Sequence, residues 1–202
     1  MFILDVTVAA TLGLGAQSDI LYAAWSLPQT IGRGMFQSLT NSFMGMFSKN
    51  EDTTLLFRQA ITVITLLSII AATAMTLTAR WWLPLSMLGA DSLTWLKGIL
   101  PASILAWLIA FLGPAETFRA IYYRADSLVL PSASRILGTM VAVGIILLTR
   151  GEKEPVLVAW AVVSGAAVET VIGFVGFKWL LNFRYRISWP DSTTLGEMIR
   201  IV

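Results

Sequence analysis

The chain has 202 residues, of which 56% are hydrophobic and only 13% are charged, and its mean hydropathy is +0.76. Soluble domains carry about 25% charged residues, so this composition excludes an ordinary soluble domain and indicates a chain that lies mostly in a lipid bilayer. The net charge of +2 argues against a nucleic-acid partner, and the absence of cysteine and histidine excludes disulfides, Cys or His metal sites, thiol nucleophiles and a Ser-His-Asp triad.

The first predicted helix, residues 2–13, is mostly apolar and carries one charged residue, Asp5. It is about half as long as a helix that spans a ~30 Å hydrocarbon core. It has no basic region before the apolar stretch and contains an acid, so it does not resemble a signal peptide. We interpret it as the second half of a spanning helix.

The second predicted span, residues 19–48, carries Arg33 near its middle. On an ideal helical wheel, one face of this segment is polar from end to end. The polar residues on that face are Asp19, Tyr22, Ser26, Gln29, Thr30, Arg33, Gln37, Thr40 and Asn41. A charge at the bilayer centre costs at least ~3 kcal/mol, so such a face must meet protein or a water-filled cavity.

Arg33 needs a partner in that cavity, and the sequence leaves two alternatives open. Asp19 is about 21 Å away along the helix axis, too far for direct pairing. The planar fork of an arginine suits an anionic group such as phosphate, because it can donate two hydrogen bonds at once. The alternative is a buried ion pair with Glu169 or another acid that only fixes helix packing.

Four more segments are long and apolar enough to span the bilayer. The predicted spans are residues 56–79, 93–118, 127–149 and 155–181. The connections between them are short and polar, which leaves no room for a soluble domain. We therefore predict one membrane domain over residues 1–202, an all-α polytopic transmembrane bundle of about six helices. Residues 190–202 start with Pro190 and a helix-start signal, and predict the beginning of a seventh helix.

The basic residues of alternating loops predict the orientation of the chain. One side collects Lys49, Arg58, Arg119, Arg124, Lys178, Arg184 and Arg186, and the other side collects Arg80, Lys97, Arg150 and Lys153. The richer side is expected to be cytoplasmic, which places the N-terminus inside.

A few charged and small residues within the later spans suggest contacts between helices. We expect Glu116, near the cytoplasmic end of its helix, to face headgroups or solvent. Arg135 and Glu169 lie in otherwise apolar spans, where a charge marks a functional site or an ion pair between the two. With Asp5, these three residues are the candidates for ion coupling or ion pairing. Residues that predict close helix contact are Gly138, Gly144, Gly165, Ala166 and Ala167.

A resemblance to the MurJ/MviN lipid II flippase family is carried by the stretch FILDVTVAATLGLGAQSDILYAAWSLPQTIGRGMFQSLTNSF. The family pattern has an Asp, a short apolar stretch, Gly-x-Gly, Ser/Thr-Asp, an aromatic-rich turn and Leu-Pro. The matching positions are Asp5, Gly13, Gly15, Asp19, Leu27, Pro28 and Arg33. A second stretch, FLGPAETFRAIYYRADSLVLPSASRILG, is similar to the fourth-to-fifth helix connection of that family.

The resemblance covers nearly the whole chain and implies one lobe of a transporter. In the multidrug/oligosaccharidyl-lipid/polysaccharide exporter superfamily, two six-helix lobes enclose a cavity that opens to each membrane face in turn. The chain departs from the family at Leu4, where the family has Arg, at Gly32, where a second basic residue is frequent, and at Gln37, where an acid is usual. A polyprenyl-linked saccharide other than lipid II therefore fits as well.

The resemblance and the polar face together favour a flippase of a lipid-linked saccharide. In this hypothesis Arg33 engages the phosphate while the neighbouring polar residues hydrate the sugar. The candidate substrate-binding residues are Asp19, Ser26, Gln29, Arg33, Gln37 and Asn41. The expected partners are the lipid-linked saccharide, membrane lipids and a second transporter lobe from the same gene, a separate chain or self-association. We expect no cofactor and no nucleic acid, and a location in the bacterial inner membrane.

Two alternatives come from other functional classes. The first is an ion-coupled exporter of organic cations, in which Asp19 and Glu169 would carry the coupling ion. The second is an inactive, truncated membrane scaffold. An enzyme is disfavoured, because the sequence shows no convincing carboxylate pair, phosphate-binding glycine loop or nucleophile-base pair.

Overall fold

The computed structural model describes residues 2–13, 15–38, 41, 53–87, 92–124, 127, 129–149, 152, 154–180, 187–190 and 192. Within these ranges the regular structure is helical and no strand occurs, so the predicted all-α class is confirmed. The helices are α1 (Phe2–Leu12), α2 (Ala16–Gln29), the π-helix η1 (Thr30–Met35), α4 (Thr53–Leu77), α5 (Ala79–Ser86), α6 (Ser92–Ala106), α7 (Leu108–Arg124), α8 (Val129–Leu148) and α9 (Pro155–Leu180).

Four helical stretches in the described part of the chain are long and apolar enough to cross a membrane: Thr54–Leu77, Thr94–Tyr123, Val129–Leu148 and Pro155–Gly176. The second of them joins α6 and α7 through Trp107, whose N–H donates to the carbonyl of Ile104 at 3.0 Å. Its 30 residues extend over about 45 Å, more than the ~30 Å hydrocarbon core. The short apolar stretch Ile3–Leu12 lies in α1.

Two glycines, Gly13 and Gly15, lie between α1 and α2 in the sequence GLGAQS. Gly13 ends α1 with a φ of +79°, a left-handed conformation that glycine adopts without steric cost. Gly15 precedes α2, and its N–H donates to the Ser18 hydroxyl at 3.1 Å, while that hydroxyl donates to the Gly15 carbonyl at 2.7 Å. The two glycines of this motif therefore have different roles. Gly13 provides the left-handed backbone conformation that ends α1, and Gly15 forms the hydrogen bonds with Ser18 that cap the start of α2.

Replacing Gly13 by alanine is expected to lower stability by about 1 kcal/mol, because a Cβ atom is disfavoured at positive φ. No side chain crowds the position, so the backbone conformation is the sole expected cause. Gly15→Ala is the matched control, because Gly15 also has open space around it but lies in the extended region. Melting temperatures of both variants in detergent test this expectation, and an equal loss in the two variants would contradict it.

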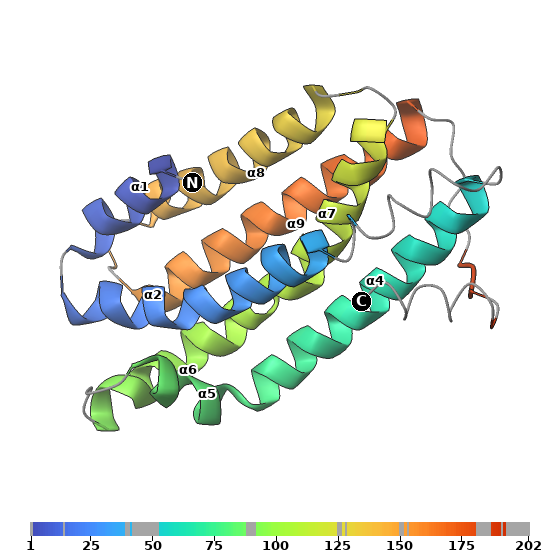
Figure 1. The fold of residues 1–202 in the computed structure, drawn as a ribbon. Coiled ribbons are helices and arrows are strands. Elements are labelled where there is room, and N and C mark those ends of the chain that lie inside the picture. Colours follow the sequence, from blue (N-terminus) through green and yellow to red (C-terminus); the bar gives the residue numbers. More distant parts are fainter. Residues whose placement is uncertain are drawn as a thin grey trace.

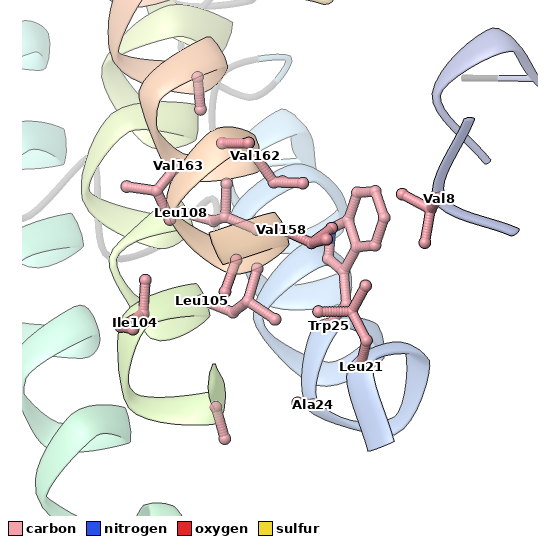
Figure 2. Close-up of a cluster of buried hydrophobic side chains, with 14 of the residues drawn as sticks. Val8, Leu21, Ala24, Trp25, Ile104, Leu105, Leu108, Val158, Val162 and Val163 are labelled. Carbon is pink, nitrogen blue, oxygen red and sulfur yellow. The ribbon is translucent and has the colours of Figure 1, made fainter. Parts of the chain in front are cut away.

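The described helices pack side by side around a core that contains side chains from both α1 and α9. Figure 1 shows α9 between α8 and α7, with α2 beside α6 and α4 along the outer side of α7. Figure 2 shows the core, where Trp25 of α2 lies among side chains from α1, α6, α7 and α9. The labelled neighbours are Val8, Leu21, Ala24, Ile104, Leu105, Leu108, Val158, Val162 and Val163. This core holds α2 against α6 and α9.

The short helix α5 falls between two predicted spans. Trp82 anchors it to the end of α4, because the indole Nε1 donates to the carbonyl of Met75 at 3.0 Å. Arg80 is exposed, and its guanidinium carbon lies 4.5 Å from the centre of the Trp81 ring. The sequence patterns predicted no helix between the spans 56–79 and 93–118, so α5 was not anticipated.

The segment at residues 187–190 follows the last described helix and lies against α4. The Gln59 amide donates to the carbonyl of Trp189 at 3.3 Å, and the N–H of Ser188 donates to the Thr62 hydroxyl at 3.4 Å. Most of the predicted seventh helix lies outside the described residues, as does most of the second predicted span after Ser38. The single membrane domain and the cytoplasmic N-terminus stay predictions.

Candidate functional site

Five charged side chains gather where η1, α7, α8 and α9 face one another. The larger polar hollow, about 190 Å³, is lined by Arg33, Gln37, Asn41, Glu116, Arg119, Ala120, Tyr123 and Arg135. The smaller hollow, about 50 Å³, is lined by Leu4, Trp25, Gln29, Arg33, Leu108, Leu112, Arg135, Gly138, Thr139, Ala142, Val162, Gly165, Ala166 and Glu169. Arg33 and Arg135 line both hollows. The two hollows thus form one region that carries three arginines and two glutamates.

Arg119 is the centre of the ion pairs in this region. Its Nη1 donates to both carboxylate oxygens of Glu116 at 2.6 Å, and its Nη2 donates to Oε1 of Glu169 at 2.5 Å. The arginine side chain is 13% exposed, and the two glutamates are 5% and 6% exposed. Buried charges require such pairing, because desolvation of an unpaired charge costs several kcal/mol. One cation therefore serves two buried carboxylates from two helices.

The expected position of Glu116 at the headgroups or in solvent is wrong. The residue is 5% exposed and lies inside the bundle, where it pairs with Arg119, three positions further along α7 on the same helix face. Glu169, which the sequence offered as a partner of Arg33 or Arg135, has its ion pair with Arg119. Arg119 was counted among the cytoplasmic loop residues, but it is a half-buried residue of α7 and does not support the predicted orientation.

Arg33 reaches the hollows from a widened turn of its helix. Pro28 lies within α2 and has no N–H to donate, and the π-helix η1 begins two residues later. Gly32 brings η1 close to α7, since a Cβ atom there would lie 3.1 Å from Cδ1 of Leu112 and 3.5 Å from Cα of Ile109. The sequence Pro-Gln-Thr-Ile-Gly-Arg-Gly thus contains both causes of the local geometry, the missing donor and the close contact.

The polar face of the second predicted span is divided by this geometry. Gln29, Arg33, Gln37 and Asn41 line the hollows. Asp19 and Ser26 are exposed residues of α2 that line neither hollow, and the Ser26 hydroxyl donates to the carbonyl of Ala23 at 3.1 Å. Asp5 of α1 also lies outside the hollows, where its carbonyl accepts a bond from the Tyr22 hydroxyl at 3.2 Å. The roles of Asp19 and Ser26 in substrate binding, and of Asp5 in ion coupling or ion pairing, stay predictions.

Arg33 and Arg135 face the same space from opposite helices. Arg135, on α8, is exposed, whereas Arg33 is half-buried. Arg135 and Arg119 repel the charge of Arg33, and Glu169 and Glu116 attract it. With three arginines and two carboxylates, the region has one positive charge in excess. Its electrostatics therefore favour a bound anion.

Close contact between α8 and α9 places Glu169 beside this region. A Cβ atom on Gly138 would lie 2.5 Å from the carbonyl oxygen of Gly165 and 3.1 Å from Cβ of Glu169. The predicted helix contact through Gly138 and Gly165 is thus confirmed. The same prediction is wrong for Gly144, because a Cβ atom added there would have nothing within 4 Å, so this glycine is not needed for the contact.

Another described hollow, about 500 Å³, lies between α4, α7 and α9, and its chemistry differs. Its lining is apolar and aromatic apart from two threonines, and one of these, Thr170, already donates its hydroxyl to the carbonyl of Phe111 at 2.8 Å. It offers no charge to orient a polar ligand. The polar hollows are accordingly the candidate site.

Three polar residues that line the hollows were not predicted as site residues from the sequence: Arg119, Tyr123 and Thr139. The spacing of Glu116 and Arg119 could have indicated a helical ion pair. Tyr123 lies one helical turn beyond Arg119, on the same face of α7. Thr139 lies one turn after Arg135 on α8, and its hydroxyl donates to the Arg135 carbonyl at 2.9 Å.

Apolar spanning helices around a charged polar hollow define a polytopic membrane protein with an internal site for a polar group. The sequence model of the family described as Lipid II flippase MurJ matches residues 8–200. The chain therefore belongs to the MurJ lipid II flippase family, as the resemblance of its first helices suggested. No curated protein matched the chain. At the level of the family, the protein is a membrane transporter of the peptidoglycan pathway.

Proposed function

We propose that this protein moves a polyprenyl-pyrophosphate-linked saccharide across the bacterial inner membrane by alternating access. The observation that carries the proposal is the hollow with excess positive charge, formed by Arg33 and Arg135 around the Arg119 ion pairs. A diphosphate carries the charge that complements these arginines, and arginine donates two parallel hydrogen bonds to such a group. Family membership supports a lipid-linked substrate.

The polar residues beside Arg33 have the chemistry to bind the saccharide. Gln29, Gln37 and Asn41 line the hollows with amide groups, which both donate and accept hydrogen bonds. These groups can replace the water around sugar hydroxyls while the lipid chain stays in the bilayer. We assign them to the sugar and Arg33 to the phosphate.

The exposed part of the polar face supports a second lobe. Asp19, Ser26, Thr30 and Gln37 are exposed along α2, η1 and the residues after them. Polar groups at membrane depth must face protein or water, because lipid cannot hydrogen bond to them. We propose that this face meets a second lobe, from the same gene, a separate chain or a second copy, across a water-filled cavity. The cytoplasmic position of the N-terminus belongs to the same proposal.

The alternative of organic-cation export requires an acidic residue in the hollows whose negative charge is not compensated within the protein. Glu169 is buried and bound to Arg119, so its charge is already compensated within the protein. Asp19 is exposed but lines neither hollow. These positions favour the anionic lipid-linked substrate over a cationic one.

Replacing Arg33 by alanine is expected to reduce translocation about tenfold or more, because a charge-assisted hydrogen bond contributes about 1.5–3 kcal/mol. The measurement is transfer of a fluorescent polyprenyl-pyrophosphate saccharide across vesicles that contain the full transporter. Arg80→Ala is the matched control, since Arg80 is exposed on α5 and lines neither hollow. Translocation by Arg33→Ala at the wild-type rate would refute the proposed role.

A further inference from the structure

We propose that the apolar hollow between α4, α7 and α9 binds one acyl chain of a bilayer phospholipid, and that the phosphate of this lipid lies at Lys178 of α9. The hollow has a volume of about 500 Å³ and is separate from the polar hollows. The inference goes beyond the proposed function, because this lipid is bound on the outside of the bundle and is not transported.

The chemistry of the lining matches a hydrocarbon chain. Apart from Thr65 and Thr170, the lining residues are apolar or aromatic. The hydroxyl of Thr170 is shared between the carbonyls of Phe111 and Ala166, at 2.8 and 2.9 Å, so it is already satisfied within the protein. An apolar cavity of about 150 Å³ is enough to hold benzene. The hollow therefore has room for a considerably longer hydrocarbon.

The length of the hollow matches one leaflet of the bilayer. Along the helix that includes α7, the lining extends from Trp107 to Phe118, a helical rise of about 16 Å. Half of the ~30 Å hydrocarbon core is about 15 Å. Trp107 lies near the middle of the spanning stretch Thr94–Tyr123, and Phe118 lies towards its end. The hollow thus extends from mid-membrane towards one surface, as an acyl chain does.

The hollow opens to the outside of the described bundle. Four large apolar side chains of its lining are between 40% and 59% exposed: Ile69, Trp107, Val171 and Phe174. They belong to helical stretches that are long and apolar enough to span a membrane. At that depth lipid replaces water around exposed side chains. An acyl chain can therefore enter the hollow directly from the bilayer.

A positive charge lies beyond the outer end of the hollow. The rings of Phe118 and Phe174 meet edge to face there, with their centres 6.0 Å apart. Lys178 follows Phe174 by one turn on the same side of α9, and it is exposed. A lysine near the end of a spanning helix extends its ammonium group to the level of the headgroups. Its charge complements the phosphate of a phospholipid whose chain lies in the hollow.

The position of α7 favours a bilayer lipid over the chain of the transported substrate. At 100° per residue, Ala110, Pro114 and Phe118 lie on the side of α7 opposite to Glu116 and Arg119. Two hydrogen bonds join α7 to α9 beside the hollow, one from Thr170 to Phe111 and one from the Tyr122 hydroxyl to the Gly173 carbonyl at 2.7 Å. A chain in the hollow is thus separated from the polar hollows by the packed pair of helices.

The experiment is photolabelling of the purified full protein in detergent with phosphatidylglycerol that carries a diazirine on one acyl chain. Peptide mass spectrometry should place the label on α4, α7 and α9 at the hollow, above the level on the exposed face of α8. Ala110→Trp should lose most of this label, because the indole ring fills the hollow. Met140→Trp is the matched control, since it adds the same ring at an exposed position of α8 outside the hollow. Val171→Trp, which narrows the mouth at an exposed position, provides the same test if Ala110→Trp does not fold.

Competition identifies the source of the chain. Excess unlabelled phosphatidylglycerol should displace the label, and Lys178→Glu should weaken labelling by removing the partner of the phosphate. Displacement by polyprenyl pyrophosphate but not by phosphatidylglycerol would assign the hollow to the substrate chain and overturn the inference. Labelling of α8 equal to that of the hollow, or full labelling of both tryptophan variants, would indicate bulk lipid contact alone and would also overturn it.

Thermal stability gives a second measurement. Adding phosphatidylglycerol to the delipidated protein should raise the melting temperature of wild type by about 5 °C, because a ligand that binds only the folded state stabilises it. The increase should be smaller in Ala110→Trp, where the ring already occupies the space. An equal increase in both proteins would contradict the site. Neither measurement involves transport, so a negative result leaves the flippase proposal intact.

Discussion

Replacing Arg119 by alanine is expected to destabilise the protein by about 3–5 kcal/mol, the largest effect of any single substitution considered for this chain. The change removes the cation that pairs with Glu116 and Glu169, which are 5% and 6% exposed. Both carboxylates would then lie in the bundle without their partner. A fall in melting temperature on the order of 10 °C in detergent corresponds to this loss.

Neutralising the whole ion-pair group is the control that separates charge from packing. Arg119→Met with Glu116→Gln and Glu169→Gln leaves no buried charge in the group, and such replacements are often neutral or stabilising. We expect this triple variant to melt near the wild-type temperature. Arg119→Lys should be intermediate, because an ammonium cannot present two separate nitrogens to two carboxylates. A triple variant as unstable as Arg119→Ala would show that the guanidinium stabilises the bundle through its shape and packing and not through its charge.

Replacing Gly138 by alanine is expected to cost about 1–3 kcal/mol, because the added Cβ would lie 2.5 Å from the Gly165 carbonyl oxygen. A backbone oxygen cannot rotate away as a side chain can, so α8 and α9 must separate. The Glu169 backbone lies 3.3 Å from the same position, so the ion pair with Arg119 should shift as well. We therefore expect a lower melting temperature together with slower translocation.

Gly144→Ala provides the matched control on the same helix. An added Cβ at Gly144 meets nothing within 4 Å, and alanine is the better helix former. This variant should be neutral or more stable by about 0.5–1 kcal/mol. If the alanine variants at positions 138 and 144 had the same melting temperature, close packing of α8 on α9 would not limit stability.

The sequence predicts the helices well where apolar length decides them. Backbone N–H and C=O groups find no water in lipid and must hydrogen bond within the chain. Uncharged segments such as residues 59–79 therefore form helices whatever their neighbours are. The predicted ranges 127–149 and 155–181 lie close to α8, Val129–Leu148, and α9, Pro155–Leu180. The short α5 was missed because its role depends on contacts such as that of Trp82 with Met75.

The candidate site was predicted in part. Arg33 and its polar neighbours were found because a cation in an apolar span has few explanations. The ideal wheel could not show that Asp19 and Ser26 lie outside the hollows, because it assumes one constant turn angle through Pro28 and the π-helix. Arg119 was assigned to a loop because the predicted span ended at residue 118, whereas α7 continues to Arg124. Its ion pair with Glu169 joins residues that are 50 positions apart, so no local pattern could reveal it.

The sequence by itself determined that the protein lies in a lipid bilayer, that it is helical and that it belongs to its family. These properties follow from local features: apolar length, the position of single charges and a motif in the first two helices. Only the tertiary structure decided which charges meet. Ion pairing depends on how α7, α8 and α9 rotate about their axes, and contacts such as that of Gly138 with Gly165 set this rotation. Such contacts join distant residues, and no periodicity within one helix encodes them.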